Sequence, residues 1–262
     1  MVKVISIVCQ KGGVGKTTTS VHLGIGLARH GKKVLLVDAD AQASMTISLG
    51  YTDPRRFSDT LASIMSGIIA ETPIDTSKGI LPHNEGVYLL PANSDLAAME
   101  IFLANTNTLS REFIMQEYIN LVSMEYDYII IDTQPSLGML TINALAAANT
   151  VIIPVQAEYL AAKGLEQLLF TISKVQKRIN TALEIGGILP TMVNERTNEA
   201  KEIISSINDA YGGKIHIYGS IPRSVKVPET SKSGCSLYQS APSNKVALAY
   251  EAFTREVLPG EK

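Results

Sequence analysis

The chain has 262 residues, enough for one large domain or two small ones with a substantial buried core. Hydrophobic residues make up 45% of it and charged residues 18%, which excludes a wholly disordered chain. The 23 basic and 25 acidic side chains give a net charge of −2, so charge alone neither favours nor excludes a nucleic-acid partner. Two cysteines are too few for a disulfide framework or an all-cysteine zinc site. The apolar stretches are too short to span a membrane, and we expect no secretory leader.

Short apolar runs alternate with longer helical patterns along the chain. We expect strands at 4–8, 34–37, 87–90, 128–132, 150–155 and 184–191. We expect helices at 17–30, 96–103, 111–124, 165–179, 198–211 and 245–257, another ending near 148, and the least regular chain at 52–54, 72–86 and 226–244. Strands that are apolar throughout are buried on both faces, which is typical of parallel strands joined by helices. The prediction is an α/β fold over 1–262, with one doubly wound, mostly parallel sheet and helices on both faces.

A glycine-rich loop follows the first expected strand and opens the first expected helix. Its sequence is CQKGGVGKTTT, at 9–19. Glycines at 12, 13 and 15 let successive backbone N–H groups converge on one anion, and the helix N-terminus adds a positive dipole end. The loop therefore predicts a phosphate-binding site. The alternative, a glycine turn that only introduces a helix, would require a chance match to the glycines, the Gly-Lys-Thr run and the strand–helix context.

Each side chain after the glycines has an expected role in binding a nucleoside triphosphate. Lys16 is placed to contact the β- and γ-phosphates, and Thr17 to put its hydroxyl on Mg²⁺. Thr18 is placed to reach the α-phosphate. We assign nucleotide binding to Lys11, Gly12, Gly13, Val14, Gly15, Lys16, Thr17 and Thr18.

The loop departs from the ordinary phosphate-loop pattern at its start, where Gln10 replaces glycine and Lys11 adds a second lysine. This form resembles the deviant Walker A motif of the ParA/MinD/NifH group of P-loop ATPases, and the longer loop is similar to that of the ParA/Soj partition ATPases. The resemblance extends, in the right order, to VLLVDADAQASMT at 34–46, YDYIIIDTQPSLGMLTINAL at 126–145, VIIPVQAEYLAAKGL at 151–165 and SIPRSVKVPETSKSG at 220–234.

The resemblance implies a homodimer that sandwiches two ATP molecules. Lys11 would cross to the nucleotide of the partner subunit, where its charge neutralises phosphate. Gly12 would leave room for the facing loop. The alternative for Lys11 is a solvated surface lysine.

Three aspartates stand at the ends of expected strands. Asp132 ends the run at 128–132, where a charged group is costly unless it faces a cation. It matches the Walker B aspartate, which holds Mg²⁺ through its water shell. Asp38 and Asp40 follow the run at 34–37, at the strand end where ligands collect in such sheets. The resemblance implies that Asp38 lies near the Mg²⁺ shell and Asp40 positions the attacking water, while a helix-capping role for one of them stays open.

Two loops depart from the family's patterns. DPQG is DAQA at 40–43, and DxPP is DTQP at 132–135, so proline is absent at 41 and 134. Cys9 replaces the commoner asparagine. We expect more flexible loops and an altered hydrolysis rate, with the phosphoryl-transfer groups retained.

The adenine and DNA contacts rest on resemblance alone. Asn194, Pro222, Val225 and Pro228 are expected at the adenine base, and Arg196 and Arg223 match positions implicated in DNA contact. The implied function is partition of a plasmid or chromosome. The ATP-bound dimer would bind duplex DNA without sequence preference, and a ParB-like partner would stimulate hydrolysis and release. The expected location is the cytoplasm, associated with the nucleoid, and not the membrane.

Three alternatives use the same loop. A MinD-like membrane-cycling ATPase would need a basic amphipathic C-terminal helix, whereas the tail at 250–262 is nearly charge-balanced. A NifH-like iron–sulfur reductase would need ligating cysteines near the nucleotide, which Cys9 and Cys235 do not provide. An ATPase that positions other cargo on the nucleoid remains open.

Overall fold

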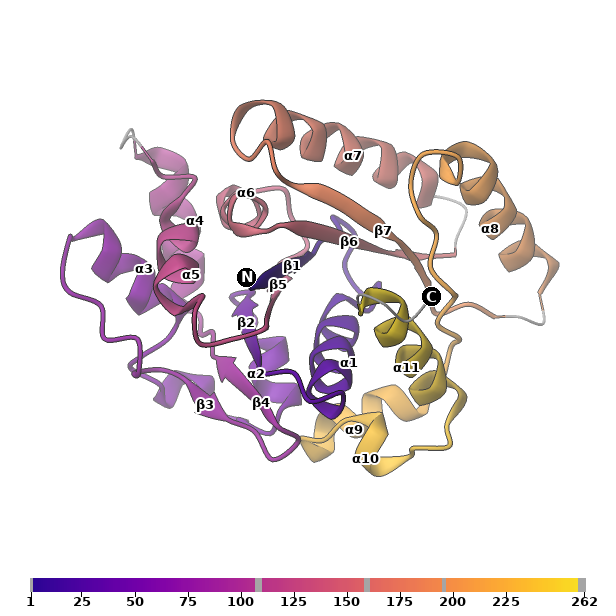
Figure 1. Ribbon diagram of the computed structural model, residues 1–262, viewed down its shortest axis with the longest axis horizontal. Coiled ribbons are helices and arrows are strands. Elements are labelled where there is room, and N and C mark those ends of the chain that lie inside the picture. The colour runs from indigo at the N-terminus through magenta and orange to yellow at the C-terminus, as the bar shows by residue number, and fades with distance from the viewer. Residues whose placement is uncertain (1, 107–109, 158–160, 195–196, 259–262) are drawn as a thin grey trace.

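The computed structural model describes residues 2–106, 110–157, 161–194 and 197–258. Within these ranges, a seven-stranded sheet has the order β3-β4-β2-β5-β1-β6-β7 (Figure 1). The strands are β1 (Lys3–Ile7), β2 (Val34–Ala39), β3 (Leu81–Pro82), β4 (Val87–Leu90), β5 (Tyr128–Thr133), β6 (Thr150–Gln156) and β7 (Glu184–Thr191). Neighbouring strands of this sheet are parallel except β3 and β4, which are antiparallel.

Helices cover both faces of the sheet. They are α1 (Lys16–Arg29), α2 (Ser44–Ser48), α3 (Leu61–Ile69), α4 (Asp95–Asn105), α5 (Ile114–Val122), α6 (Met139–Ala147), α7 (Ala161–Arg178), α8 (Asn198–Tyr211), α9 (Lys226–Ser233), α10 (Leu237–Ser240) and α11 (Lys245–Val257), with a 3₁₀ turn, η1, at Pro54–Arg56. Buried residues of α3 to α7 pack on one face, and those of α1, α2, α10 and α11 pack on the other (Figure 1). None of the described helices is long and apolar enough to cross a membrane.

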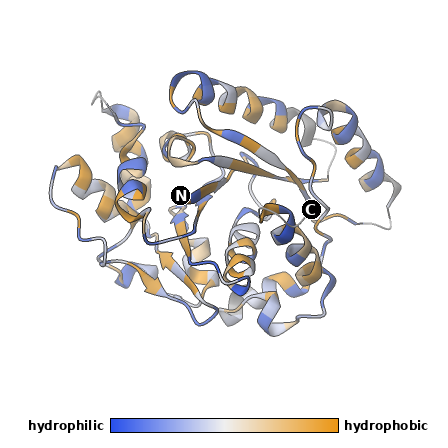
Figure 2. Cartoon of the chain, in the orientation of Figure 1, coloured by the Kyte–Doolittle hydropathy of each residue, from blue (hydrophilic) through white to orange (hydrophobic). Residues whose placement is uncertain are grey.

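The two faces explain why the strands are apolar throughout. In β5, Ile129 and Ile131 join the cluster formed with α3 to α7, while Tyr128 and Ile130 join the cluster on the opposite face. Successive side chains therefore lie in one or the other of two hydrophobic cores, and the central strands are hydrophobic over most of their length (Figure 2). The predicted doubly wound α/β fold with a mostly parallel sheet is confirmed.

The prediction of irregular chain at 226–244 is wrong, because this segment contains α9 and α10. Pro228 is the third residue of α9, in the first turn, where a backbone N–H has no partner inside the helix. Gly234 then ends the helix in the left-handed region, at φ 64°. The short strand β3 also lies in a stretch expected to be among the least regular, 72–86.

The strand order brings the candidate groups together. β5 lies between β1 and β2, with Ile7 and Asp38 both in register with Asp132. The glycine-rich loop leaves β1 at the same edge at which β2 and β5 end, each one residue after its aspartate, Asp38 or Asp132. Because parallel strands present their carboxyl ends together, loops from β1, β2 and β5 converge there.

Candidate nucleotide-binding site

The glycine-rich loop joins β1 to α1 and bounds an open cleft. Gly13 and Gly15 adopt φ angles of 73° and 85°, which a side chain would oppose. The cleft has a volume of about 470 Å³, and Asp40, Pro135 and Met192 are among its lining residues. Six of the predicted loop residues also line it: Gly12, Gly13, Gly15, Lys16, Thr17 and Thr18. The structure thus brings most of the predicted phosphate site to one cleft.

Lys16 lies at the base of this cleft and is only 7% exposed. Its Nζ donates a hydrogen bond of 3.2 Å to the carbonyl of Lys11, so the side chain folds back over the loop. Burial lowers the pKa of Lys16, while the charges of Cys9 and Asp132 oppose that shift. An anion bound in the cleft would favour the charged amine further. Lys11 itself is exposed, at the start of the loop.

Asp132 is fully buried between two hydroxyl groups of α1. Thr17 donates to its Oδ2 at 2.6 Å, and Ser20 donates to its Oδ1 at 3.0 Å. Burial, and then the charge of Asp38, raises the pKa of Asp132 to about 7. Ser20 was not predicted as a site residue. It lies three residues after Thr17, on the same face of the helix, and that spacing is the signal that could have found it.

Asp38 is also fully buried, but it is held mainly by α2. Its Oδ2 accepts hydrogen bonds from the backbone N–H and the hydroxyl of Thr46, at 2.8 and 2.7 Å. Its Oδ1 accepts from the N–H of Asp40 at 3.3 Å. Burial raises the pKa of Asp38 to about 6 despite these bonds. Asp38 therefore fixes α2 and the backbone of Asp40.

The donor set fits Mg²⁺. Two buried carboxylates, Asp38 and Asp132, face each other on neighbouring strands with raised pKa values, which a cation would lower again. Thr17 adds a hydroxyl oxygen beside them. Within the described chain, no cluster of three or more His, Cys, Asp or Glu forms a closed metal site. Mg²⁺ needs no such cage, because it is commonly held by one or two protein oxygens, substrate phosphates and water.

Asp40 lines the phosphate cleft and is half-buried. It starts a tight turn, in which its Oδ1 accepts from the N–H of Gln42 at 2.9 Å and its carbonyl accepts from the N–H of Ala43 at 2.8 Å. Ala43 stands where the family pattern DPQG has glycine, and its φ of 52° is left-handed. That conformation costs a non-glycine residue about 1 kcal/mol.

A second cavity of about 270 Å³ adjoins the phosphate cleft. Pro222, Val225 and Pro228, three of the predicted base contacts, line it, and the surface is mostly apolar, as an adenine ring requires. Met192 lines both cavities and adopts a left-handed φ of 54°. Nothing in its local sequence pattern marks it, because its position depends on the end of β7.

The remaining predicted residues are placed differently. Asn194 is exposed and is not among the described residues that line the second cavity. Val14 is buried, and its carbonyl accepts from the hydroxyl of Thr191 at 2.8 Å, so it anchors the loop from behind. Arg223 is exposed and borders the second cavity. Arg196 lies outside the described residues.

Residues 2–185 match a family model described as an AAA domain. The chain is 42% identical over 258 residues to the sporulation initiation inhibitor protein Soj of Bacillus subtilis, covering 98% of each chain. It is 39% identical over 260 residues to the chromosome-partitioning ATPase Soj of Treponema pallidum, again with 98% of each chain covered. The chain belongs to the Soj/ParA family of P-loop ATPases. The resemblance inferred from its motifs is confirmed.

Solved structures share the fold of this chain. A structure titled cobyrinic acid a,c-diamide synthase from Mycobacterium smegmatis, with bound ATP analogue and magnesium, is 35% identical with a TM-score of 0.83, covering 97% of this chain and 93% of that one. MinD from Pyrococcus horikoshii, complexed with Mg-ADP, is 22% identical with a TM-score of 0.76, covering 99% and 97%, and shows the shared fold. ATP and Mg²⁺ are the cofactors that the phosphate cleft fits.

Proposed function

We propose that this Mg²⁺-dependent ATPase partitions a chromosome or plasmid, by using ATP to close a dimer that binds DNA. The observation that carries the proposal is the pairing of two lysines in one loop. Lys16 is buried at the base of the phosphate cleft, while Lys11 is exposed at the loop's start. The whole-chain similarity to two Soj proteins supports a role in partition.

The dimer is supported by Gly12, which is exposed beside Lys11. A Cβ built on Gly12 would meet one described atom within 4 Å, the Cβ of Pro135 at 3.9 Å, which is ordinary contact. Its φ lies outside the range that favours glycine. The described part of the chain thus gives no packing reason for glycine at this position. A second subunit that brings its own loop against this one supplies the reason, and would bring its Lys11 to the phosphates.

The chemistry needs positioning and charge neutralisation more than covalent steps. Lys16 would neutralise the phosphates from within its own chain, and Lys11 from the partner subunit. Thr17 and Asp132 would hold Mg²⁺, which supplies further charge neutralisation when bound. Asp40 would orient the attacking water through its carboxylate, since the turn at 40–43 fixes the residue.

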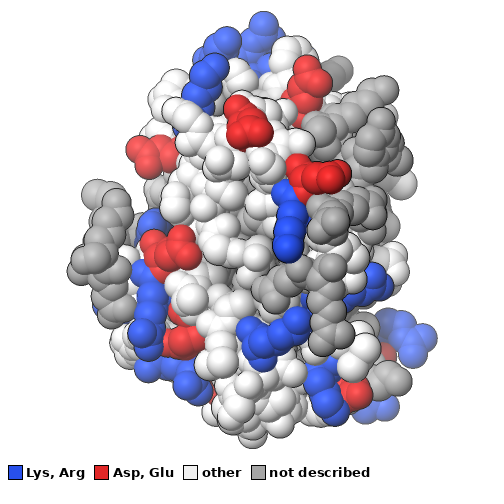
Figure 3. Space-filling model, turned by 90° about the vertical axis from the view of Figure 1, so that its right-hand side faces the viewer, with Lys and Arg blue, Asp and Glu red and all other residues white. Residues whose placement is uncertain are grey.

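DNA binding would follow from dimerisation. Basic and acidic side chains are interspersed on the side of the molecule shown in Figure 3. A single chain with that mixture would bind duplex DNA weakly, and pairing two chains would double the number of phosphate contacts. Arg223 borders the base cavity, so its position would respond to the nucleotide. A ParB-like partner would then stimulate hydrolysis and release, and the ATP-bound form would associate with the nucleoid.

A membrane-cycling role is less well supported. It would need an amphipathic helix with an accessible apolar face. The apolar face of α11 is buried against the core instead, through Val246, Tyr250, Phe253 and Val257.

The test is binding of a labelled random-sequence duplex, measured by fluorescence anisotropy with ATP, with ADP and without nucleotide, over a range of salt concentrations. We expect binding that needs ATP and that weakens steeply as salt rises, because phosphate contacts release counterions. Arg223→Ala should reduce affinity and the salt slope, and Arg55→Ala, an exposed arginine of η1, is the matched control. DNA binding that does not depend on the nucleotide or on the salt concentration would refute the proposal.

A further inference from the structure

Glu100 of α4 caps a helix to which it does not belong. Its Oε1 accepts from the N–H of Met139 at 2.7 Å, and its Oε2 accepts from the N–H of Leu140 at 2.8 Å. These are the first two residues of α6, which begins after Gly138 without a side-chain cap or an acidic residue of its own in the first turn. The carboxylate therefore satisfies two unpaired N–H groups and opposes the positive end of the helix dipole.

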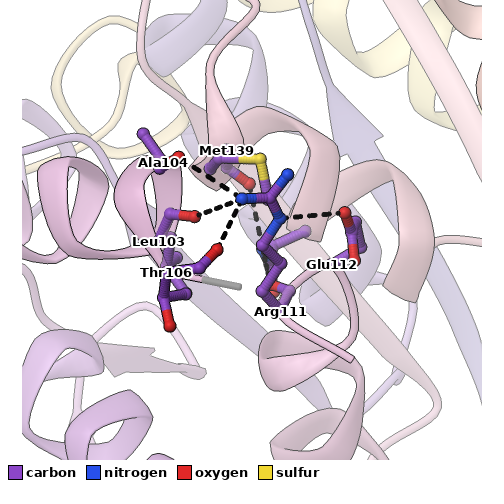
Figure 4. A network of polar contacts seen from close by, with 7 residues as sticks. Leu103, Ala104, Thr106, Arg111, Glu112 and Met139 are labelled. Carbon is purple, nitrogen blue, oxygen red and sulfur yellow. Dashed lines mark hydrogen bonds and ion pairs between the residues drawn. The ribbon is translucent and has the colours of Figure 1, made fainter. Parts of the chain in front are cut away.

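The Glu100 carboxylate lies close to the backbone of Gly138, the residue before α6. A Cβ on Gly138 would overlap the Glu100 carboxylate, so any other residue at this position would displace the carboxylate from the start of α6. The other end of α4 is fixed as well, because Arg111 donates to the carbonyls of Leu103, Ala104 and Thr106 (Figure 4). Asn143 of α6 donates in turn to the carbonyl of Arg111 at 2.8 Å. Helices α4 and α6 are thus joined at two points.

Glu100 also reaches the loop that follows Asp132. Its Oε2 accepts from Nε2 of Gln134 at 3.2 Å. The next residue, Pro135, lines the phosphate cleft and faces Gly12. The loop at 134–138 is therefore held by Glu100 at both ends, through a side chain at its start and two backbone amides just after its finish.

Gln134 stands where the family pattern DxPP has its first proline. Proline restricts the backbone by its ring. The structure shows a different restraint here, the hydrogen bond from the Gln134 amide to Glu100. The Gln134 side chain thus ties the loop to α4 at the position where the family pattern has proline.

We propose that Glu100 is a positioning residue for ATP hydrolysis, which holds the loop at 134–138 against the phosphate cleft through Gln134 and the first amides of α6. Glu100 is not among the described residues that line the phosphate cleft. The inference rests on the proposed ATPase function. It assigns to α4 a mechanical link with the nucleotide site, and this link acts on turnover rather than on nucleotide affinity.

Steady-state ATPase kinetics test this link. Glu100→Gln keeps the size of the side chain but replaces one acceptor oxygen with a donor. We expect kcat to fall about tenfold with KM within about twofold, because a small displacement at a reacting centre slows the chemistry more than binding. Gln134→Ala should lower kcat less. Glu117→Gln, on the exposed side of α5, is the matched control and should leave both constants unchanged.

Coupling and rescue distinguish positioning from general destabilisation. Gln134→Ala should cause little further loss in a Glu100→Gln background, because both changes break one link. Gln134→Pro should recover part of the lost kcat in that background. Unchanged kcat in both single variants, or losses that simply multiply, would overturn the inference. A wild-type chain without any ATP turnover would instead refute the proposed function, and this inference with it.

Discussion

The hydroxyl of Thr17 donates a 2.6 Å hydrogen bond to Asp132, and so joins the first turn of α1 to the end of β5. The bond places the hydroxyl proposed to ligate Mg²⁺ directly beside the carboxylate that is proposed to hold the same ion. Ser20 holds the other carboxylate oxygen at 3.0 Å. One face of α1 therefore aligns the phosphate loop with Asp132, and a change at either end should disturb metal-dependent binding.

Asp132→Asn should remove the Mg²⁺-dependent part of ATP affinity. The amide keeps the volume of the side chain but carries no charge to balance the cation. Calorimetric titration with ATP, with and without Mg²⁺, measures this difference. Asp209→Asn, an exposed residue of α8, is the control. An Asp132→Asn protein whose ATP affinity still rises with Mg²⁺ as in the wild type would contradict the assignment.

Lys16→Ala should abolish measurable ATP binding. The side chain is the buried cation at the base of the cleft, so its removal leaves the phosphate charge opposed only by backbone N–H groups and the helix dipole. The same titration, with Lys177→Ala of α7 as an exposed control, gives the readout. Normal affinity in the Lys16→Ala protein would show that the nucleotide binds elsewhere.

Hydrophobic periodicity and the glycine-rich motif predicted the helices and the phosphate loop, because these features depend on residues close together in the sequence. The helices at 198–211 and 245–257 have the predicted bounds, and the phosphate loop lies between β1 and α1 as expected. Helix α9 was missed because Pro228 and Gly234 are typical of turns. Here the proline occupies the first turn of a helix and the glycine its end, and both positions suit those residues.

Long-range contacts could not be predicted. Glu100 and Met139 are 39 residues apart, and neither residue type indicates that the other is near. Asp38 could be assigned to the strand end, but its main partner, Thr46, depends on how α2 folds back over β2. Periodicity identifies which residues are buried. It does not identify which buried polar groups meet.

His22 should make the free energy of unfolding pH-dependent. Its Nε2 accepts the N–H of Leu237 at 3.1 Å, so its Nδ1 carries the proton and donates to the carbonyl of Thr18 at 2.8 Å. Burial lowers the pKa of His22 from 6.5 to about 4. Below about pH 6.5 the unfolded chain takes up a proton that the folded chain does not. The stabilisation that comes from the neutral His22 side chain is therefore complete above that pH and is lost as the pH falls toward 4.

The loss should amount to about 3 kcal/mol between about pH 6.5 and pH 4. Asp38 and Asp132 act in the opposite direction over this range, because their pKa values are raised. Denaturant unfolding of the wild type and of His22→Gln at several pH values isolates the histidine, since both proteins keep the aspartates. Parallel pH profiles for the two proteins would contradict the neutral, buried state of His22.

The mass of the Asp40→Ala protein in solution with Mg²⁺ and ATP, measured by sedimentation equilibrium, shows whether two chains close around ATP. We expect this variant to bind ATP without turnover and to form a dimer, because the proposed water-orienting carboxylate is lost while Lys11 and Lys16 remain. Adding Lys11→Ala should return it to a monomer while ATP remains bound, with Lys78→Ala as the exposed control. The proposal that two chains close around ATP would be contradicted if the ATP-loaded Asp40→Ala protein stayed monomeric at high concentration. It would also be contradicted if the protein still formed a dimer after Lys11→Ala was added.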